Sequence, residues 1–390
     1  MNKEIYLDYS TTSRPSEKSV GRILTFLTHL WGTPFAPHHA GQKLLSALEE
    51  GYQSIYTLLD ASEKDRFIFT SSGAEAVNHA FFATYFDITR STGKNQFVTS
   101  KIEEAPALMS ISRLEQLGCV GKMVAPDDTG RISATAIESA LTPRTALVSL
   151  SWANGLTGTI QPIAEIAAIC KQRNIRLHLD VTHVLGKLFL DLPEIRPDLI
   201  SFNGEQIHAS QGTGGLFIRE GVQCSPWIVG GLEQSGQRAG NMNLPAFMGL
   251  AQAAKEALDT RDFLCTEVAR LRDLLEEELL SLYPEARIPF RNQERLPHCS
   301  VILFPGIANE ALLHALNRQK VFATIGGGNF QQLRLLLAAS GVPNALAQTA
   351  VGFQLSRETT EEEIRRAAQL IAATAARLRQ LSIHLESICT

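Results

Sequence analysis

The chain has little excess charge of either sign and no long apolar run. Its 36 lysines and arginines face 40 aspartates and glutamates, and the resulting net charge of -4 gives no sign of a nucleic-acid or membrane partner. No uncharged run approaches the roughly 18 residues that a membrane helix requires, and the chain enters a charged, strand-like segment without an apolar signal region. We therefore expect a cytoplasmic protein with no nucleic-acid and no membrane partner.

Cysteine is also sparse. The six cysteines are Cys119, Cys170, Cys224, Cys265, Cys299 and Cys389. They are widely scattered and show no paired spacing, so neither a disulfide framework nor a zinc site is indicated. We expect buried or incidental thiols and no metal site.

What the chain does have is an ordinary globular composition, with 44% hydrophobic and 19% charged residues over 390 positions. That length predicts two domains. Through the first two thirds, short β-rich runs alternate with helix-patterned segments, which predicts a mostly parallel sheet covered on both faces. The strand candidates are 67–70, 96–100, 122–125, 146–152, 176–181, 199–202 and 215–219. Motifs that follow these strands should converge, because ligands of such sheets lie beyond the carboxyl ends of the strands.

The last third predicts a second unit. A helical stretch from about residue 244 to 282 has no proline after Pro245 and plausibly links the two units. The second unit begins near residues 300–304 and ends with a helix announced by a capping-box pattern at 359–363. Apolar residues then recur at helical spacing from Ile364 to Leu378.

Seven segments occur in the order typical of one enzyme family. They are 5–12 (IYLDYSTT), 32–34 (GTP) with His38, 69–75 (FTSSGAE), 180–187 (DVTHVLGK), 237–241 (QRAGN), 296–298 (LPH) and 357–364 (RETTEEEI). On these motifs the chain resembles the cysteine desulfurases, which are class V aminotransferases of pyridoxal-phosphate (PLP) fold type I. The resemblance covers nearly the whole chain.

The resemblance implies an α/β fold in which a seven-stranded, mostly parallel sheet is joined by a smaller α+β domain. The large domain would span residues 15–258, and the small domain would combine residues 1–14 with residues 259–390. It also implies a homodimer whose active sites lie near the subunit interface.

The residue that would hold the cofactor is missing. In the family a lysine follows a Ser-Gly-His run, whereas here Gln206 follows Asn203-Gly-Glu205. A carboxamide nitrogen is neither basic nor nucleophilic, so the usual Schiff base cannot form on Gln206. Lys187 is the nearest lysine in the sequence, but the family has a lysine there as well, and we expect it at the surface.

Three further positions differ from the family's catalytic residues, so no catalytic residue is expected to be intact. Glu104 stands where the family stacks a histidine on the cofactor ring, although such a residue taken alone is more often a solvated acid at a helix start. Gly352 stands where the family has the arginine that clamps the substrate carboxylate. The loop that carries the family's sulfur-accepting cysteine aligns with residues 323–330, where Gly328 is the nearest match.

The expected cofactor-binding positions are partly retained. Asp180 matches the carboxylate that pairs with the pyridinium nitrogen of PLP, with a strand-end cap as the alternative reading. The full set carried over from the family is Ser72, Gly73, Ala74, Asn154, Asp180, His183, Asn203, Glu205, Gln206 and Asn241. Of these, Ala74, His183, Asn203, Glu205 and Asn241 replace the family's residues. An added carboxylate about 4–5 Å from a phosphate costs on the order of 1–4 kcal/mol, so we expect no covalent PLP and at most weak non-covalent binding.

Three functional hypotheses follow. The first is a non-catalytic homologue that acts by binding a partner, such as a sulfur-carrier protein, an iron–sulfur scaffold or an active paralogue. The second is an active cysteine desulfurase or aminotransferase-like enzyme with a remodelled site. The third is an inert relic with a structural role only, which the sequence does not separate from the first.

Overall fold

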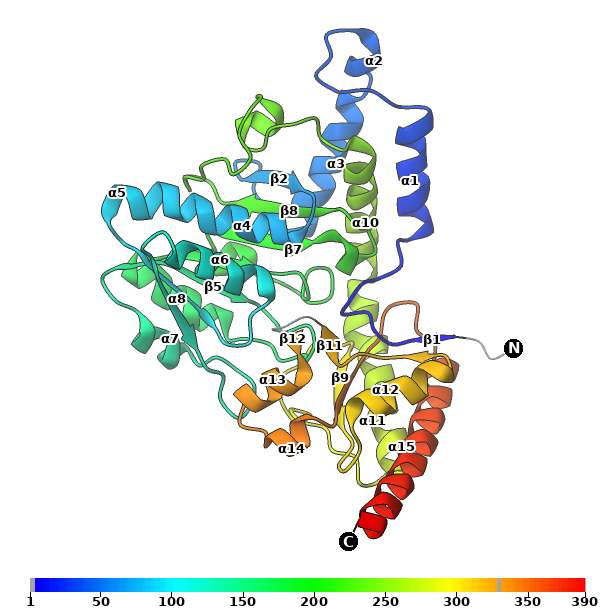
Figure 1. Ribbon diagram of the computed structural model, residues 1–390. Helices are drawn as coiled ribbons and strands as arrows, with labels where there is room; N and C mark the ends of the chain where they lie inside the picture. Colours follow the sequence, from blue (N-terminus) through cyan, green and yellow to red (C-terminus); the bar gives the residue numbers. More distant parts are fainter. Residues whose placement is uncertain (1–3, 328–330, 390) are drawn as a thin grey trace.

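The computed structural model describes residues 4–327 and 331–389. Its centre is a seven-stranded sheet in the order β2-β8-β7-β6-β5-β3-β4 (Figure 1). The strands are β2 (Arg66–Thr70), β3 (Gln96–Ser100), β4 (Val120–Val124), β5 (Thr145–Ser151), β6 (Arg176–Asp180), β7 (Leu199–Asn203) and β8 (Gly214–Ile218). Only β8 runs antiparallel to its neighbours, so the mostly parallel sheet predicted from the sequence is confirmed.

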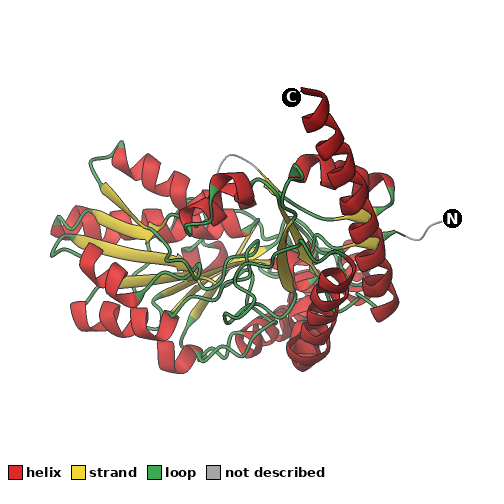
Figure 2. Cartoon of the chain, turned by 90° about the horizontal axis from the view of Figure 1, so that it is seen from below, coloured by secondary structure: helices red, strands yellow, loops and turns green. Residues whose placement is uncertain are grey.

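Helices cover both faces of this sheet, as Figure 2 shows. The helices of this part of the chain are α1 (Glu17–Thr28), α2 (His39–Gln42), α3 (Leu45–Leu58), α4 (Gly73–Thr84), α5 (Arg90–Thr92), α6 (Ala105–Glu115), α7 (Ala134–Ala140), α8 (Ile163–Arg173), α9 (Leu192–Ile195) and α10 (Leu244–Phe263). The central strands of the sheet are buried on both sides, and their sequences are therefore mostly apolar; β7 (LISFN) is an example.

The long helical stretch expected at 244–282 is continuous but contains a π-helical turn. That turn, Leu264–Val268, joins α10 to α11 (Ala269–Leu282). α10 packs its first half into the core beneath the sheet, whereas α11 belongs to a second apolar cluster. A single helical element therefore spans both parts of the molecule.

The second part contains the remaining elements, which are β9 (Cys299–Leu303), α12 (Asn309–Arg318), β10 (Val321–Phe322), β11 (Gly326–Gly327), β12 (Gln331–Gln332), α13 (Leu333–Ala339), α14 (Asn344–Ala347), β13 (Ala350–Gln354) and α15 (Glu361–Cys389). The N-terminal strand β1 (Ile5–Tyr6) joins this part by pairing in parallel with β10. Ile5 and Leu7 accordingly lie in the second apolar cluster, together with residues between 264 and 375. The proposed boundaries at 14/15 and 258/259 stay a prediction.

The last helix begins as its sequence predicts. Thr360 Oγ1 accepts a hydrogen bond from the Glu363 amide at 3.3 Å, and Glu363 Oε2 accepts one from the Thr360 amide at 3.1 Å. This reciprocal pair satisfies two backbone donors that a helix start leaves free. None of the helices in the described part of the chain is long and apolar enough to cross a membrane.

Candidate functional site

A cavity of about 240 Å³ lies beyond the carboxyl ends of the central strands. Its walls come from Ser10, Thr11, Glu104, Asn154, Gly155, Leu156, Thr182, His183, Asn203, Gln206, Gly326, Gly327 and Gln331. The loops after β5, β6 and β7 supply most of these residues, as expected for a mostly parallel sheet. No lysine or arginine is among these described wall residues.

Five of the predicted site residues line this cavity: Glu104, Asn154, His183, Asn203 and Gln206. Asp180 lies at the end of β6, while Ser72 and Gly73 lie at the start of α4. Ala74 and Asn241 are exposed, and neither contributes to the cavity wall in the single chain. Gly328 lies outside the described residues.

A hydrogen-bonded pair of side chains lies in the cavity. His183 Nε2 donates to Glu104 Oε1 over 2.7 Å, with the histidine side chain 7% exposed and the glutamate side chain 34% exposed. Burial raises the pKa of Glu104, but the hydrogen bond and charge of His183 outweigh it, so the pKa is lowered. Glu104 is therefore an ionised partner of His183 rather than a solvated helix-start acid.

Gly155 makes the orientation of His183 possible. A Cβ atom at position 155 would lie 2.3 Å from ring atoms of His183, a distance that no ordinary side chain tolerates. The small residue at 155 and the imidazole at 183 thus belong to one local arrangement.

Two other carboxyl groups lie close to this pair. Burial raises the pKa of Glu103 to about 7, even though its carboxylate accepts hydrogen bonds from Ser100 and Ser151. Burial and the nearby Glu104 raise the pKa of Asp180. Asp180 accepts hydrogen bonds from the Thr182 amide at 2.9 Å and from Ser201 Oγ at 2.6 Å. It therefore also caps the turn after β6, as the alternative reading expected.

The start of α4 is packed tightly against the end of β7. A Cβ at Gly73 would lie 3.2 Å from the Asn203 Cβ, which is closer than most side-chain contacts. Asn203 Nδ2 donates to Glu205 Oε1 at 3.0 Å, and Thr12 Oγ1 donates to Glu205 Oε2 at 2.8 Å. The Glu205 carboxylate is thus held beside the residue that touches the helix start.

Side chains cap two backbone amides at this helix start. Ser72 Oγ accepts a hydrogen bond from the Glu75 amide, and Glu75 Oε2 accepts one from the Ser71 amide at 2.8 Å. Arg238 donates to Glu75 Oε1 at 2.8 Å. Asn154 is occupied in a similar way, because it accepts from two backbone amides of its own turn and donates to the Ile102 carbonyl.

Gln206 forms a wall between the cavity and a buried lysine. Its Nε2 donates to the Ser10 carbonyl at 2.8 Å, and its Oε1 accepts from Lys187 Nζ at 3.1 Å. The expectation that Lys187 lies at the surface is wrong, since the residue is only 7% exposed. Gly186, at φ 68°, lets the chain approach α10 so closely that a Cβ there would lie 2.7 Å from the Ala257 Cβ.

A side chain at Gly352 would crowd its neighbours. Gly352 lies in β13, and a Cβ atom would meet Gln354 Nε2 at 2.7 Å and Thr324 Cγ2 at 3.1 Å. The five described cysteines are free, and all except Cys265 are buried. Nowhere in the described ranges do three or more histidine, cysteine or acidic side chains form a group that could hold a metal ion.

Comparison with known proteins identifies the family. The model of the aminotransferase class-V family matches residues 5–366. This chain belongs to that family. It is 32% identical over 383 residues to a cysteine desulfurase of Gluconacetobacter diazotrophicus, covering 97% of this chain and 95% of the relative. It is 33% identical over 384 residues to the cysteine desulfurase NifS of Azotobacter vinelandii, covering 97% and 94%.

Solved structures of class-V aminotransferase relatives have the same fold. A NifS-like protein superposes with a TM-score of 0.90 at 27% identity, covering 96% of this chain and all (100%) of that one. The DndA protein of Streptomyces lividans superposes with a TM-score of 0.77 at 27% identity, covering 90% and 99%. The expected PLP fold type I and the cysteine desulfurase relationship are thus confirmed, and the family is PLP-dependent.

The sequence did not reveal several contacts of this class-V aminotransferase site. The Lys187–Gln206 hydrogen bond joins residues 19 positions apart, and the Thr12–Glu205 bond joins residues 193 positions apart. Lys187 has three apolar neighbours in the sequence, Val184, Leu185 and Leu188, and these were a signal for its burial. The Thr12 contact had no local signal.

Proposed function

We propose that this chain is a non-catalytic cysteine desulfurase homologue that acts through partner binding in sulfur transfer or iron–sulfur assembly. The observation that carries the proposal is the hydrogen-bonded amide of Gln206, which stands between the cavity and Lys187. Because no described wall residue of the cavity is a lysine, no amine lines the site at which a covalent cofactor would attach.

The residues around the cavity do not fit PLP. The Glu104 and His183 side chains meet within the cavity, and Glu205 places a carboxylate beside the start of α4. Each carboxylate about 4 Å from a phosphate costs on the order of 4 kcal/mol at an effective dielectric constant of 20. Every 1.4 kcal/mol weakens binding tenfold, so we infer that PLP binds weakly at most and without a covalent bond.

The same side chains make an unsuitable substrate site. Gly352 lies within β13 where the resemblance implies an arginine, and glycine supplies no planar cation to clamp a substrate carboxylate. These differences lie on separate elements of the chain. Restoring one residue would therefore leave the others unchanged.

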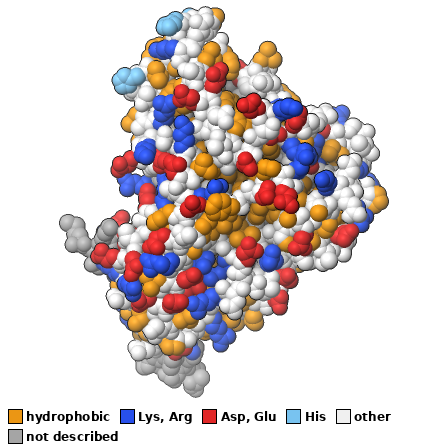
Figure 3. All heavy atoms as spheres, turned by 180° about the vertical axis from the view of Figure 1, so that it is seen from behind, with side chains coloured by type: hydrophobic (Ala, Val, Ile, Leu, Met, Phe, Trp, Pro, Cys, Tyr) orange, Lys and Arg blue, Asp and Glu red, His pale blue; other side chains and the backbone are white. Residues whose placement is uncertain are grey.

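The proposed partners are a second copy of this chain and a sulfur-carrier protein, an iron–sulfur scaffold or an active paralogue. α1 presents an apolar row to the outside, with Val20 41%, Leu24 52% and Leu27 57% exposed at helical spacing. Figure 3 shows charges of both signs interspersed with hydrophobic side chains over one face, which favours protein surfaces over a polyanion as the partner. We also propose a cytoplasmic location.

The deciding experiment combines absorption and sulfide measurements on the purified chain. After incubation with PLP and dialysis, we expect no Schiff-base absorption band and no sulfide release from cysteine above that of protein-free buffer. An active cysteine desulfurase should be measured in parallel as the positive control. A retained band with sulfide release would instead establish the active-enzyme alternative, which Asp180 at the end of β6 favours.

A separate experiment tests partner binding. The immobilised chain should retain a sulfur-carrier protein, a scaffold or an active paralogue under native conditions, whereas a denatured sample of the same chain should not. If none of the three is retained, the partner proposal fails even when the chain is inactive. The remaining hypothesis is then an inert relic with a structural role only.

A further inference from the structure

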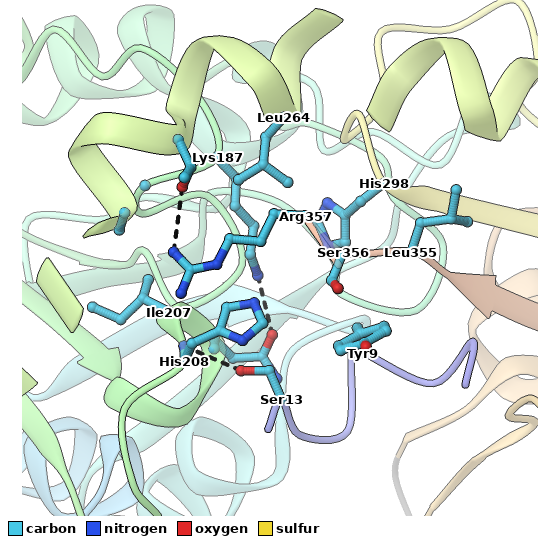
Figure 4. A pocket seen from close by; sticks show the side chains of 14 residues that line it. Tyr9, Ser13, Lys187, Ile207, His208, Leu264, His298, Leu355, Ser356 and Arg357 are labelled. Carbon is cyan, nitrogen blue, oxygen red and sulfur yellow. Dashed lines mark hydrogen bonds between the residues drawn. The ribbon is translucent and has the colours of Figure 1, made fainter. Parts of the chain in front are cut away.

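Lys187 is a buried lysine without a counter-ion. Its side chain enters a small internal cavity, and Nζ donates its hydrogen bond to the neutral Gln206 amide at 3.1 Å (Figure 4). Within the described ranges, the structure gives Lys187 no ion pair with any carboxylate. A buried ammonium that lacks a negative partner is costly, because burial disfavours the charged form.

The groups around this small cavity do not supply the missing charge. His298 is 1% exposed, and neither of its ring nitrogens has a hydrogen-bond partner among the described residues. Arg357 is itself a cation and is paired with Glu256, while burial lowers the pKa of His208 to about 4. A charged Cys299 would raise the pKa of Lys187. Burial raises the pKa of the Cys299 thiol itself to about 11, however, so the thiol is uncharged near neutral pH.

Burial lowers the pKa of Lys187 to about 7. The Lys187 amine is then deprotonated in about half of the molecules at neutral pH, whereas an ordinary lysine amine is deprotonated in about one molecule in 2,500. A desolvated lysine near other cationic groups is the environment in which lysine becomes a nucleophile.

Gln206 separates this amine from the larger cavity. It is the residue that lines both the small cavity around Lys187 and the larger cavity at the strand ends. The small cavity holds only about 20 Å³, room for about one water molecule. When the Gln206 side chain moves, a small carbonyl compound in the larger cavity can therefore reach Nζ.

We propose that Lys187 is a masked nucleophile that condenses with small carbonyl compounds when Gln206 swings aside. The nitrogen lone pair attacks the carbonyl carbon, and the C–N bond forms as the carbon–oxygen π bond breaks. The two amine protons leave with the carbonyl oxygen as water, so an aldehyde and the amine give an imine and one water. The step needs no oxidant and no reductant, and it is independent of partner binding.

The test labels the intact chain with glycolaldehyde in the presence of cyanoborohydride, which fixes an imine as a stable secondary amine. Peptide mass spectrometry then gives the labelling rate of Lys187 and of the exposed Lys122, the internal control, between pH 6 and 9.5. We expect Lys187 to reach half of its maximal rate near pH 7, and the Lys122 rate to keep rising through pH 9.

Two substitutions at one position separate access from reactivity. Gln206→Ala should raise the Lys187 rate at least tenfold, because it removes the wall, and the Lys122 rate should not change. Gln206→Glu keeps the size of the side chain but places a carboxylate oxygen about 3 Å from Nζ, which is the present distance of the Gln206 Oε1 atom. It should hold the proton on the amine and shift the half-maximal pH above 9. Circular dichroism shows whether both variants fold.

The proposal is overturned if Lys187 follows the pH profile of Lys122 in the native chain. That profile would mean that the amine keeps its proton, as it would beside a small bound anion. Labelling of Lys187 that is equally slow in the native chain and in a folded Gln206→Ala variant would also overturn it. Sulfide release is not part of this readout, so a chain that released sulfide would refute the proposed function and leave the result on Lys187 intact.

Discussion

His183 Nε2 lies 2.7 Å from Glu104 Oε1, and the imidazole is held there by the absence of a side chain at Gly155. The two paired residues come from the loop after β6 and from the start of α6. Neither could adopt this arrangement if position 155 carried a Cβ atom. The three positions therefore form one unit that occupies the cavity.

Substituting Gly155→Ala should break this unit. The added methyl group would lie 2.3 Å from the His183 ring, so the ring must move and lose its bond to Glu104. We expect a loss of about 1–3 kcal/mol in unfolding free energy, which is typical of overpacking, together with a changed His183 signal in ¹⁵N NMR. Urea unfolding measures the first quantity.

The matched control is Gly21→Ala. A Cβ at Gly21, in the middle of α1, would meet no atom within 4 Å. Alanine there should stabilise the protein by up to about 1 kcal/mol through helix propensity. If both substitutions had the same effect, the contact between Gly155 and His183 would be irrelevant to stability.

Glu103 and Lys187 should contribute opposite slopes to the pH dependence of stability. Burial raises the pKa of Glu103 to about 7, so this carboxyl group is more protonated in the folded than in the unfolded chain between pH 4.5 and 7, and its contribution to stability falls as pH rises through this window. Burial lowers the pKa of Lys187 from 10.5 to about 7, so this amine is less protonated in the folded chain between pH 7 and 10.5, and its contribution to stability rises. Each slope is on the order of 1 kcal/mol per pH unit.

Single variants assign these slopes. The unfolding free energy of the native chain minus that of Glu103→Gln should fall between pH 4.5 and 7, and the corresponding difference for Lys187→Met should rise between pH 7 and 10. Urea unfolding at half-unit pH intervals provides the free energies. A difference for Lys187→Met that stays constant over this range would show that Lys187 does not titrate there.

The sequence predicted the secondary structure of this molecule better than the contacts between residues far apart in the chain. The seven strands were readable because β-rich runs alternate with helical segments, and the Thr360–Glu363 cap was readable because its pattern is local. The apolar neighbours of Lys187 were a local signal of its burial, but the close approach of Gly186 to Ala257 on α10, 71 positions further along, had none. The bond from Gln206 to the Ser10 carbonyl spans 196 positions, and no local pattern encodes such a pairing.

Replacing Gln206→Lys should not restore cysteine desulfurase activity. The new amine would lie close to Lys187, while Glu104 and Gly352 would remain as they are. We expect sulfide release from cysteine to stay at the level of the protein-free blank even with excess PLP. Gln206→Met, which has similar length and no amine, is the control for non-specific changes. Sulfide release by Gln206→Lys well above that of Gln206→Met would contradict the non-catalytic proposal, because one residue would then have been enough.

The exposed row on α1 offers a test of the proposed homodimer. Leu24 is 52% exposed in the single chain and lies between Val20 and Leu27 on the outer face of the helix. If a second copy covers this row, Leu24→Glu buries a charge and loses about 1.5–3 kcal/mol of apolar burial. The dissociation constant measured by analytical ultracentrifugation should then rise at least tenfold. Lys18→Glu adds the same acidic side chain at another exposed position of α1 and should leave the dissociation constant within a few-fold of that of the native chain. Equal weakening by both variants would indicate a general effect of charge, and a Leu24→Glu dimer of native strength would place the interface on another surface.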